Sequence, residues 1–252
     1  MYPHNYNMGA TVQGQFGRGV PPGGRSMAPG AMAGVGLPMM AGGNINALLA
    51  PLYGLDRAIV QQQVEPLEVF TGIETNNRYV IFNTMGQPIY YAYEETHPFA
   101  LAYMGKNRPF TIRMIDGFGQ QIMMVNSSVA TLSRQVMVQI PVGRPMAVIQ
   151  TEFGSFIPSF FVNDLYGRMM FTIRSPMNAL NGGMAALVNF HVLSGDQMSM
   201  VGMISKTYDG MFRALYTDAD TFWVSFPPTM DPSMKAMLIA ATFVVDFTFY
   251  EN

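Results

Sequence analysis

The feature that most constrains the fold is an apolar stretch near the C-terminus that has no polar face. Asp231-Pro232 sets a favourable N-cap residue directly before a proline at the first helical position of an expected helix over 231–250. Its apolar side chains point in all directions and include Met237, Leu238, Phe243, Val244 and Phe247. A helix that is apolar all round has to be covered on every side by protein or by lipid.

The length of the apolar run separates these two alternatives. The uninterrupted run Ala236–Val245 spans about 15 Å of helix, whereas a bilayer core needs about twenty residues. A longer span would include Asp246, and a carboxylate at mid-bilayer costs about 2.5–3.5 kcal/mol on insertion scales. We therefore expect a helix threaded through a barrel, with a membrane anchor as the alternative.

From Arg57 to Phe226 the sequence alternates between strand-like segments and turns. Three turns begin with Asn or Asp and carry Gly three residues later: Asn83–Gln87, Asp116–Gln120 and Asp164–Arg168. An Asx side chain bonds the backbone two residues on, and Gly accepts a positive φ, so these segments predict hairpin turns.

The segments between the turns are rich in β-branched, aromatic and Met residues. The candidate strands are Ile59–Val64, Leu67–Phe70, Arg78–Phe82, Pro88–Tyr93, Phe110–Met114, Gln121–Val125, Val136–Ile140, Ala147–Thr151, Phe160–Val162, Met169–Arg174, Leu187–Val192, Met198–Ser205 and Thr221–Phe226. About a dozen short strands at this spacing predict an all-β fold that closes into a meander barrel, because closure removes unpaired edges.

The N-terminal segment differs in composition from the rest of the chain. Met1–Gly43 holds eleven Gly, five Pro and no acidic residue. Such a segment buries too little apolar surface to offset its ordering entropy. We expect a disordered Gly/Pro/Met-rich tail over 1–45 that acts as a flexible tether. A barrel domain follows over 46–252, led by a short helix or an ordered lead-in at Asn44–Leu55.

Composition excludes several classes of function. Only 12% of residues are charged and the net charge is −2, so no basic field favours a nucleic-acid partner. The chain has 0 Cys, which excludes disulfides, thiolate metal sites and S-palmitoylation. His4, His97 and His191 lack metal-ligand spacing, and no nucleotide-binding or nucleophile motif is present. We expect no enzymatic activity.

The chain is also rich in methionine. The 24 Met fill an irregular core or form an adhesive or lipid-facing surface.

Three segments upstream of the helix carry a family resemblance. They are Gln61–Tyr79, which contains Leu67-Glu-Val-Phe-Thr-Gly-Ile-Glu-Thr-Asn-Asn77, then Arg108–Asp116, and Gly202–Lys206. With the acidic stretch and the apolar helix at the end, they resemble the phospholipid scramblase family over roughly residues 55–251. The resemblance implies a Tubby-like fold, a twelve-stranded barrel around a buried hydrophobic C-terminal helix.

The same resemblance implies a location and an activity. A scramblase associates with the cytoplasmic side of a membrane and moves phospholipids between the two leaflets. The family's Cys-rich patch for acylation corresponds here to Asn126–Ser133, which contains no Cys. We therefore expect a membrane-associated protein that is not palmitoylated and whose partner is the phospholipid membrane surface.

The resemblance also implies a calcium loop before the helix. With Asp218 at the first position of an EF-hand-like spacing, the ligand positions are Asp218, Asp220, Phe222, Val224, Phe226 and Thr229. Such a loop requires Gly at its sixth position and a carboxylate at its twelfth, and this chain has Trp223 and Thr229 there. The alternatives are a weak calcium site and a turn that carries two solvated aspartates.

Two functions from different classes remain. The first is a scramblase with weakened or lost calcium dependence, in which Met237, Leu238, Phe243, Val244 and Phe247 form the hydrophobic, lipid-related element. The second is a structural or self-assembling protein, a homo-oligomer that retains the barrel without lipid transport; the Met content and the acid-free tail favour it. A transcription-factor role ranks third because basic stripes are absent.

Overall fold

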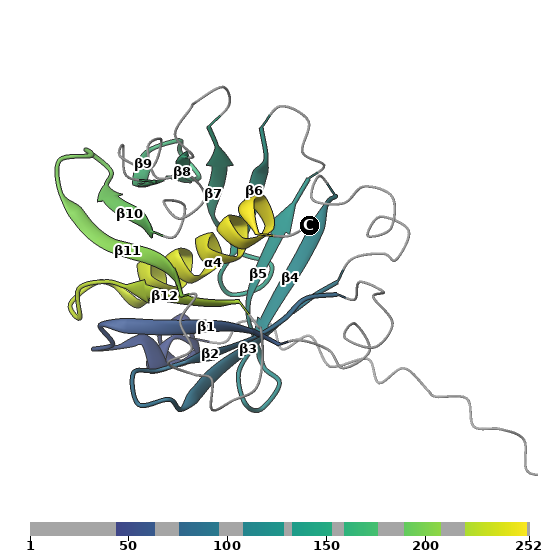
Figure 1. Ribbon diagram of the computed structural model, residues 1–252. Coiled ribbons are helices and arrows are strands. Elements are labelled where there is room, and N and C mark those ends of the chain that lie inside the picture. The colour runs from purple at the N-terminus through teal and green to yellow at the C-terminus, as the bar shows by residue number, and fades with distance from the viewer. Residues whose placement is uncertain are drawn as a thin grey trace, which may run out of the picture. The chain divides into compact units, whose positions relative to one another are not determined.

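The structure, a computed structural model, describes residues 44–63, 76–95, 108–128, 133–152, 159–175, 189–207 and 220–250. Within these residues, twelve antiparallel strands close into one barrel in which every strand pairs with its sequence neighbours and β12 pairs back with β1 (Figure 1). The strands are β1 (Arg57–Gln63), β2 (Arg78–Phe82), β3 (Pro88–Glu94), β4 (Phe110–Ile115), β5 (Gln121–Ser127), β6 (Gln135–Gln139), β7 (Pro145–Thr151), β8 (Ser159–Asp164), β9 (Met169–Arg174), β10 (Asn189–Ser194), β11 (Met200–Thr207) and β12 (Thr221–Ser225).

The predicted barrel is confirmed. Each candidate strand overlaps one of these strands, except Leu67–Phe70, which lies outside the described residues; Met198, predicted at the start of a strand, lies in the turn before β11. The tail predicted over 1–45 also lies outside them, apart from its last two residues, and stays a prediction.

The three predicted hairpin turns have the expected geometry. The side-chain Oδ1 atoms of Asn83, Asp116 and Asp164 each accept the backbone N–H groups two and four residues on, at 2.8–3.0 Å. The glycine three residues after each of them has a positive φ of 74° to 80°. The Asx hydrogen bonds and the positive φ of the glycine, all within five residues, therefore account for each turn.

The predicted C-terminal helix is α4 (Pro232–Phe249), and it runs lengthwise through the barrel (Figure 1). Asp231 is its N-cap, and the carboxylate accepts the backbone N–H of Ser233 at 2.8 Å. By length and hydropathy α4 could cross a bilayer, but 78% of its residues are buried inside the protein. The barrel wall covers this helix, as expected for the threaded arrangement.

Aromatic side chains fill the space between α4 and the wall. The ring centroids of Phe247 and Phe110 lie 4.0 Å apart, and those of Phe243 and Tyr79 lie 4.9 Å apart. Phe249 meets Phe160 edge to face at 5.7 Å. These contacts join the helix to strands on different sides of the barrel.

The two ends of the barrel differ. The tight hairpins lie at the end where α4 begins, whereas the longer connections between strands leave from the end where α4 finishes. The expected lead-in is present as α1 (Ile45–Leu48) and the 3-10 helix η1 (Ala50–Leu52), beside the start of α4. There the Lys235 ammonium donates to the carbonyls of Leu52, Leu55 and Pro228 at 2.7–3.0 Å. Burial lowers the pKa of Lys235, and these bonds fasten α4 to the chain segments before β1 and after β12.

Candidate functional site

The residues predicted as calcium ligands lie along an extended strand. Phe222 and Val224 belong to β12, which pairs with β1 on one side and β11 on the other, and their side chains are buried in the core. Phe226 is buried just after the strand, and Thr229 is exposed in the following turn. A strand rises about 3.3 Å per residue, so Asp220 and Phe226 are roughly 20 Å apart. The structure does not gather these positions around one point, and Asp218 lies outside the described residues.

The carboxylate of Asp220 already has a cationic partner. Lys206 on β11 approaches it to 2.5 Å, with only 7% of the lysine side chain exposed. The same ammonium lies 3.7 Å from the ring centroid of Tyr250, the C-cap residue of α4. Among the described residues, no group of three or more His, Cys, Asp or Glu side chains suits a metal ion. A cation bound at Asp220 would compete with Lys206.

The predicted lipid-related element lies inside the protein. Its members on α4 are at most 1% exposed: Met237, Leu238, Phe243, Val244 and Phe247. In this structure they contact the barrel wall.

A buried polar cluster at the far end of the barrel was not predicted. Glu94 and Arg108 are 3% and 1% exposed, and the guanidinium donates to both carboxylate oxygens at 3.1 and 3.3 Å. The backbone and side-chain amides of Asn77 donate to the same carboxylate at 3.1 and 3.0 Å. Gln62 in turn donates to the Asn77 side chain at 2.6 Å. The buried charges are therefore paired and hydrogen-bonded, as burial requires.

This cluster packs against the C-terminal end of α4. The Arg108 guanidinium lies 4.9 Å from the ring centroid of Phe247. Arg134 donates to the Arg108 carbonyl at 3.1 Å and lies over Phe110 at 5.1 Å. Cations at a helix C-terminus complement the helix dipole. Asn77 and Arg108 fall within the segments that carry the family resemblance, and here they hold the fold together.

The acidic residue within the apolar helix is accommodated by the same end of the barrel. Asp246 is 1% exposed, and its Oδ2 atom accepts a hydrogen bond from the Tyr79 hydroxyl at 2.7 Å. This contact joins α4 to β2. It gives a polar partner to a carboxylate that would be costly in a bilayer core.

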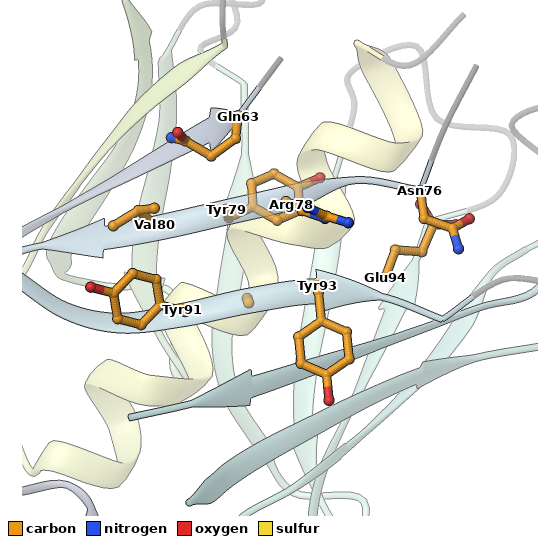
Figure 2. Close-up of a pocket in the computed structure, with 9 residues that line it drawn as sticks. Gln63, Asn76, Arg78, Tyr79, Val80, Tyr91, Tyr93 and Glu94 are labelled. Carbon is orange, nitrogen blue, oxygen red and sulfur yellow. The ribbon is translucent and has the colours of Figure 1, made fainter. Parts of the chain in front are cut away.

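The outer face of β1–β3 carries an open groove of about 450 Å³. Figure 2 shows Val80 from β2 beside the ring of Tyr91 from β3; Tyr93 also projects from β3, and Gln63 lies on β1, across β2 from both rings. Arg78 contributes a guanidinium to the same groove. A guanidinium with phenol and amide groups suits an anionic group such as phosphate, with the tyrosine rings as apolar flanks.

Trp223, the only Trp in the chain, is not a core residue. It alternates with the buried Phe222 and Val224 on β12 and is partly exposed on the outer face of the barrel. The Arg57 guanidinium lies 4.9 Å from its ring centroid. The period of two along the strand decides this orientation.

Comparisons with known proteins show similarity along nearly the whole barrel. The family model described as Scramblase matches residues 35–252. Human phospholipid scramblase 1 is 34% identical over 205 residues, covering 79% of this chain and 64% of the relative. Bovine phospholipid scramblase 2 is 33% identical, covering 78% of this chain and 69% of the relative.

Two further matches differ in strength. Human phospholipid scramblase family member 5 is 31% identical, covering 79% of this chain and 75% of the relative. A crystal structure of an Arabidopsis thaliana protein is 14% identical with a TM-score of 0.39, covering 79% of this chain and 98% of that one. A TM-score of this size establishes no common fold.

Proposed function

Because the chain belongs to the scramblase family, we propose that it is a membrane-associated protein that moves phospholipids between bilayer leaflets with weakened or lost calcium dependence. The observation that carries this proposal is the similarity to phospholipid scramblases over 205 residues, together with the match of the Scramblase family model to residues 35–252, which include the barrel strands and α4. The chain spans 64% of the length of human phospholipid scramblase 1, so that relative's activity is proposed for this chain.

The filled interior supports an outer route for lipid. The interior described here is occupied by α4 and its aromatic contacts, with inward side chains almost fully buried. Such an interior offers a lipid headgroup no passage. We infer that headgroup contact takes place on the outer surface, and the groove on β1–β3 provides a guanidinium and phenols for a phosphate.

Liposomes with a fluorescent phospholipid in both leaflets test this proposal. Dithionite quenches the outer leaflet alone unless lipid crosses the bilayer. We expect the reconstituted protein to expose inner-leaflet lipid to dithionite, and we expect Arg78→Gln to slow this step. Arg174→Gln is the matched control, because Arg174 is an exposed arginine at the same end of the barrel on β9. Equal rates of lipid movement for the two variants would contradict headgroup contact at the groove. A wild-type protein that leaves inner-leaflet lipid protected from dithionite would contradict lipid movement by this chain.

The weakened calcium dependence rests on the predicted ligands themselves. Asp220 is paired with Lys206, Phe222 and Val224 are extended and buried, and Thr229 stands where the spacing requires a carboxylate. Such a set binds calcium no more tightly than roughly millimolar. Calorimetry measures this binding, and Thr229→Asp should not tighten it, because Thr229 lies in the turn beyond the extended strand β12 and away from Asp220. Calcium binding at micromolar concentration that is abolished by Asp218→Ala would contradict the weak binding proposed here.

A self-assembling protein is the alternative function. The observation that favours it is a set of large apolar side chains exposed at hairpin turns, Phe118 and Met198 among them. Size-exclusion chromatography with and without detergent separates the two functions. Defined oligomers that persist in detergent, from a protein without lipid transport, would favour self-assembly.

A further inference from the structure

Four hairpin turns present an exposed apolar side chain at the same position. Met85, Phe118, Tyr166 and Met198, the four tip residues, are 77%, 99%, 96% and 86% exposed. Each lies two residues after an Asn or Asp whose side chain accepts its backbone N–H at 2.9–3.0 Å. Large apolar side chains that stand clear of the protein mark a contact surface when they gather in one region.

The tip residues gather at one end of the barrel. They close the hairpins β2–β3, β4–β5, β8–β9 and β10–β11, all of which turn at the end where α4 begins. The four turns form the hairpin rim. Leu165, which is 53% exposed, adds a second apolar side chain to the turn of Tyr166. Because these hairpins belong to different parts of the wall, the rim offers separate contact points around the barrel.

The backbone N–H groups of these turns are hydrogen-bonded within the turns, which suits a medium less polar than water. In the turn of Met85, the Asn83 side chain accepts the N–H groups of Met85 and Gln87, and the Asn83 carbonyl accepts that of Gly86. The N–H of Asn83 donates to the Gln87 carbonyl. The turns of Phe118 and Tyr166 repeat this pattern. Bringing these tips out of water therefore leaves few unpaired backbone donors, which would otherwise be costly.

The chemistry of the rim favours a bilayer interface over a protein groove. Phe and Tyr rings and Met side chains suit the boundary between headgroups and acyl chains, and that boundary accepts separate insertion points. The carboxylates of Asp116, Asp164 and Asp196 accept the backbone N–H groups of three of the tip residues, so these charges lie within the same turns. Hydrogen bonds to Asp164 and Asp196 lower the pKa of each, so these groups stay ionised and limit insertion to the tips. The rim is not basic, so anionic lipid gives it no advantage.

We propose that the hairpin rim docks the protein onto a membrane by inserting the four tip residues at the headgroup–acyl boundary of a zwitterionic bilayer. This inference rests on the membrane association in the proposed function and names the surface that makes it. The groove on β1–β3 begins at the opposite end of the β2–β3 hairpin from Met85, so docking and headgroup contact depend on different residues.

Co-sedimentation of the full chain with phosphatidylcholine vesicles tests the rim. We expect Phe118→Ser/Tyr166→Ser to bind roughly tenfold to a hundredfold more weakly, which corresponds to about 1.4–2.8 kcal/mol. Phe118→Trp is the matched control and should keep wild-type binding, because Trp also suits the interface. Its added fluorescence should be quenched by lipids brominated near the headgroups. Because both side chains are almost fully exposed, all variants should keep the wild-type unfolding temperature.

Several outcomes would overturn the rim as the docking surface. These are wild-type binding by the double Ser variant, no quenching of the Phe118→Trp signal, or binding that requires anionic lipid. Conversion of an oligomer to a monomer by the Ser variant, with vesicle binding intact, would make the rim a contact between copies of the chain. If the wild-type protein scrambles lipid while the Ser variant binds normally, the rim fails and the proposed function stands. A wild-type protein that neither binds vesicles nor scrambles lipid contradicts both.

Discussion

Removing the Phe247 ring should strongly destabilise the protein, because this ring sits where α4 meets the barrel wall. Phe247 is 0% exposed, lies 4.0 Å from the Phe110 ring and packs under the Arg108 guanidinium at 4.9 Å. Replacing a buried Phe by Ala costs about 3–5 kcal/mol, since the transfer free energy is lost and a cavity remains. Phe247→Ala should lose this amount from a free energy of unfolding that is roughly 5–15 kcal/mol in most domains.

Phe118→Ala is the matched control, because the same side chain is 99% exposed there. Its free energy of unfolding should stay within about 0.5 kcal/mol of wild type. Thermal unfolding followed by circular dichroism measures both variants. For a domain of this size we expect Phe247→Ala to lower the unfolding temperature by roughly 6–20 °C, at about 2–4 °C per kcal/mol. Similar small shifts for both variants would refute the threaded helix.

Three further results are expected. Gly202→Ala should destabilise the fold by about 1–3 kcal/mol or more, because its new Cβ would lie 2.3 Å from the backbone oxygen of Ser225 on β12. An unchanged unfolding temperature would contradict the close approach of β11 and β12 there. Alkaline carbonate should release the protein from membranes, because α4 is covered by the barrel; retention in the pellet without aggregation would favour a membrane anchor. Calorimetry should give no heat at micromolar calcium, because Asp220 is paired with Lys206. A micromolar dissociation constant would show that calcium displaces this lysine.

The sequence was most informative where structure depends on local patterns. The β-branched, aromatic and Met residues between the turns predicted the strands, and the Asx-x-x-Gly turns predicted the hairpins with their positive φ values. The N-cap and proline at Asp231-Pro232 predicted the start of α4. Each of these signals acts over a few residues, which is why a single sequence is sufficient to find them.

The buried polar cluster could not be predicted in this way. Asn77, Glu94, Arg108 and Arg134 come from four separate places in the chain and meet only when the barrel closes. Charged residues are usually exposed, so burial of these side chains was not expected from their types. The resemblance drew attention to Asn77 and Arg108 without indicating their structural role.

Two other differences had a signal in the sequence. The strand predicted at Thr221–Phe226 overlaps the proposed calcium spacing, and an extended strand cannot wrap an ion as a loop does. The alternation that buries Phe222 and Val224 also places Trp223 outside. In both cases the two-residue alternation of side chains along the strand indicates the structure better than ligand spacing or residue type alone.

The most direct test of calcium-independent lipid movement is the dithionite assay on reconstituted liposomes, run in parallel with a calcium chelator and with millimolar calcium. If the barrel moves lipid without a complete set of calcium ligands, dithionite should reach inner-leaflet lipid at similar rates under both conditions. Scrambling that appears only with calcium would show that the ligand set, including Asp218 and Asp220, still forms a functional trigger. No scrambling under either condition would contradict lipid movement itself.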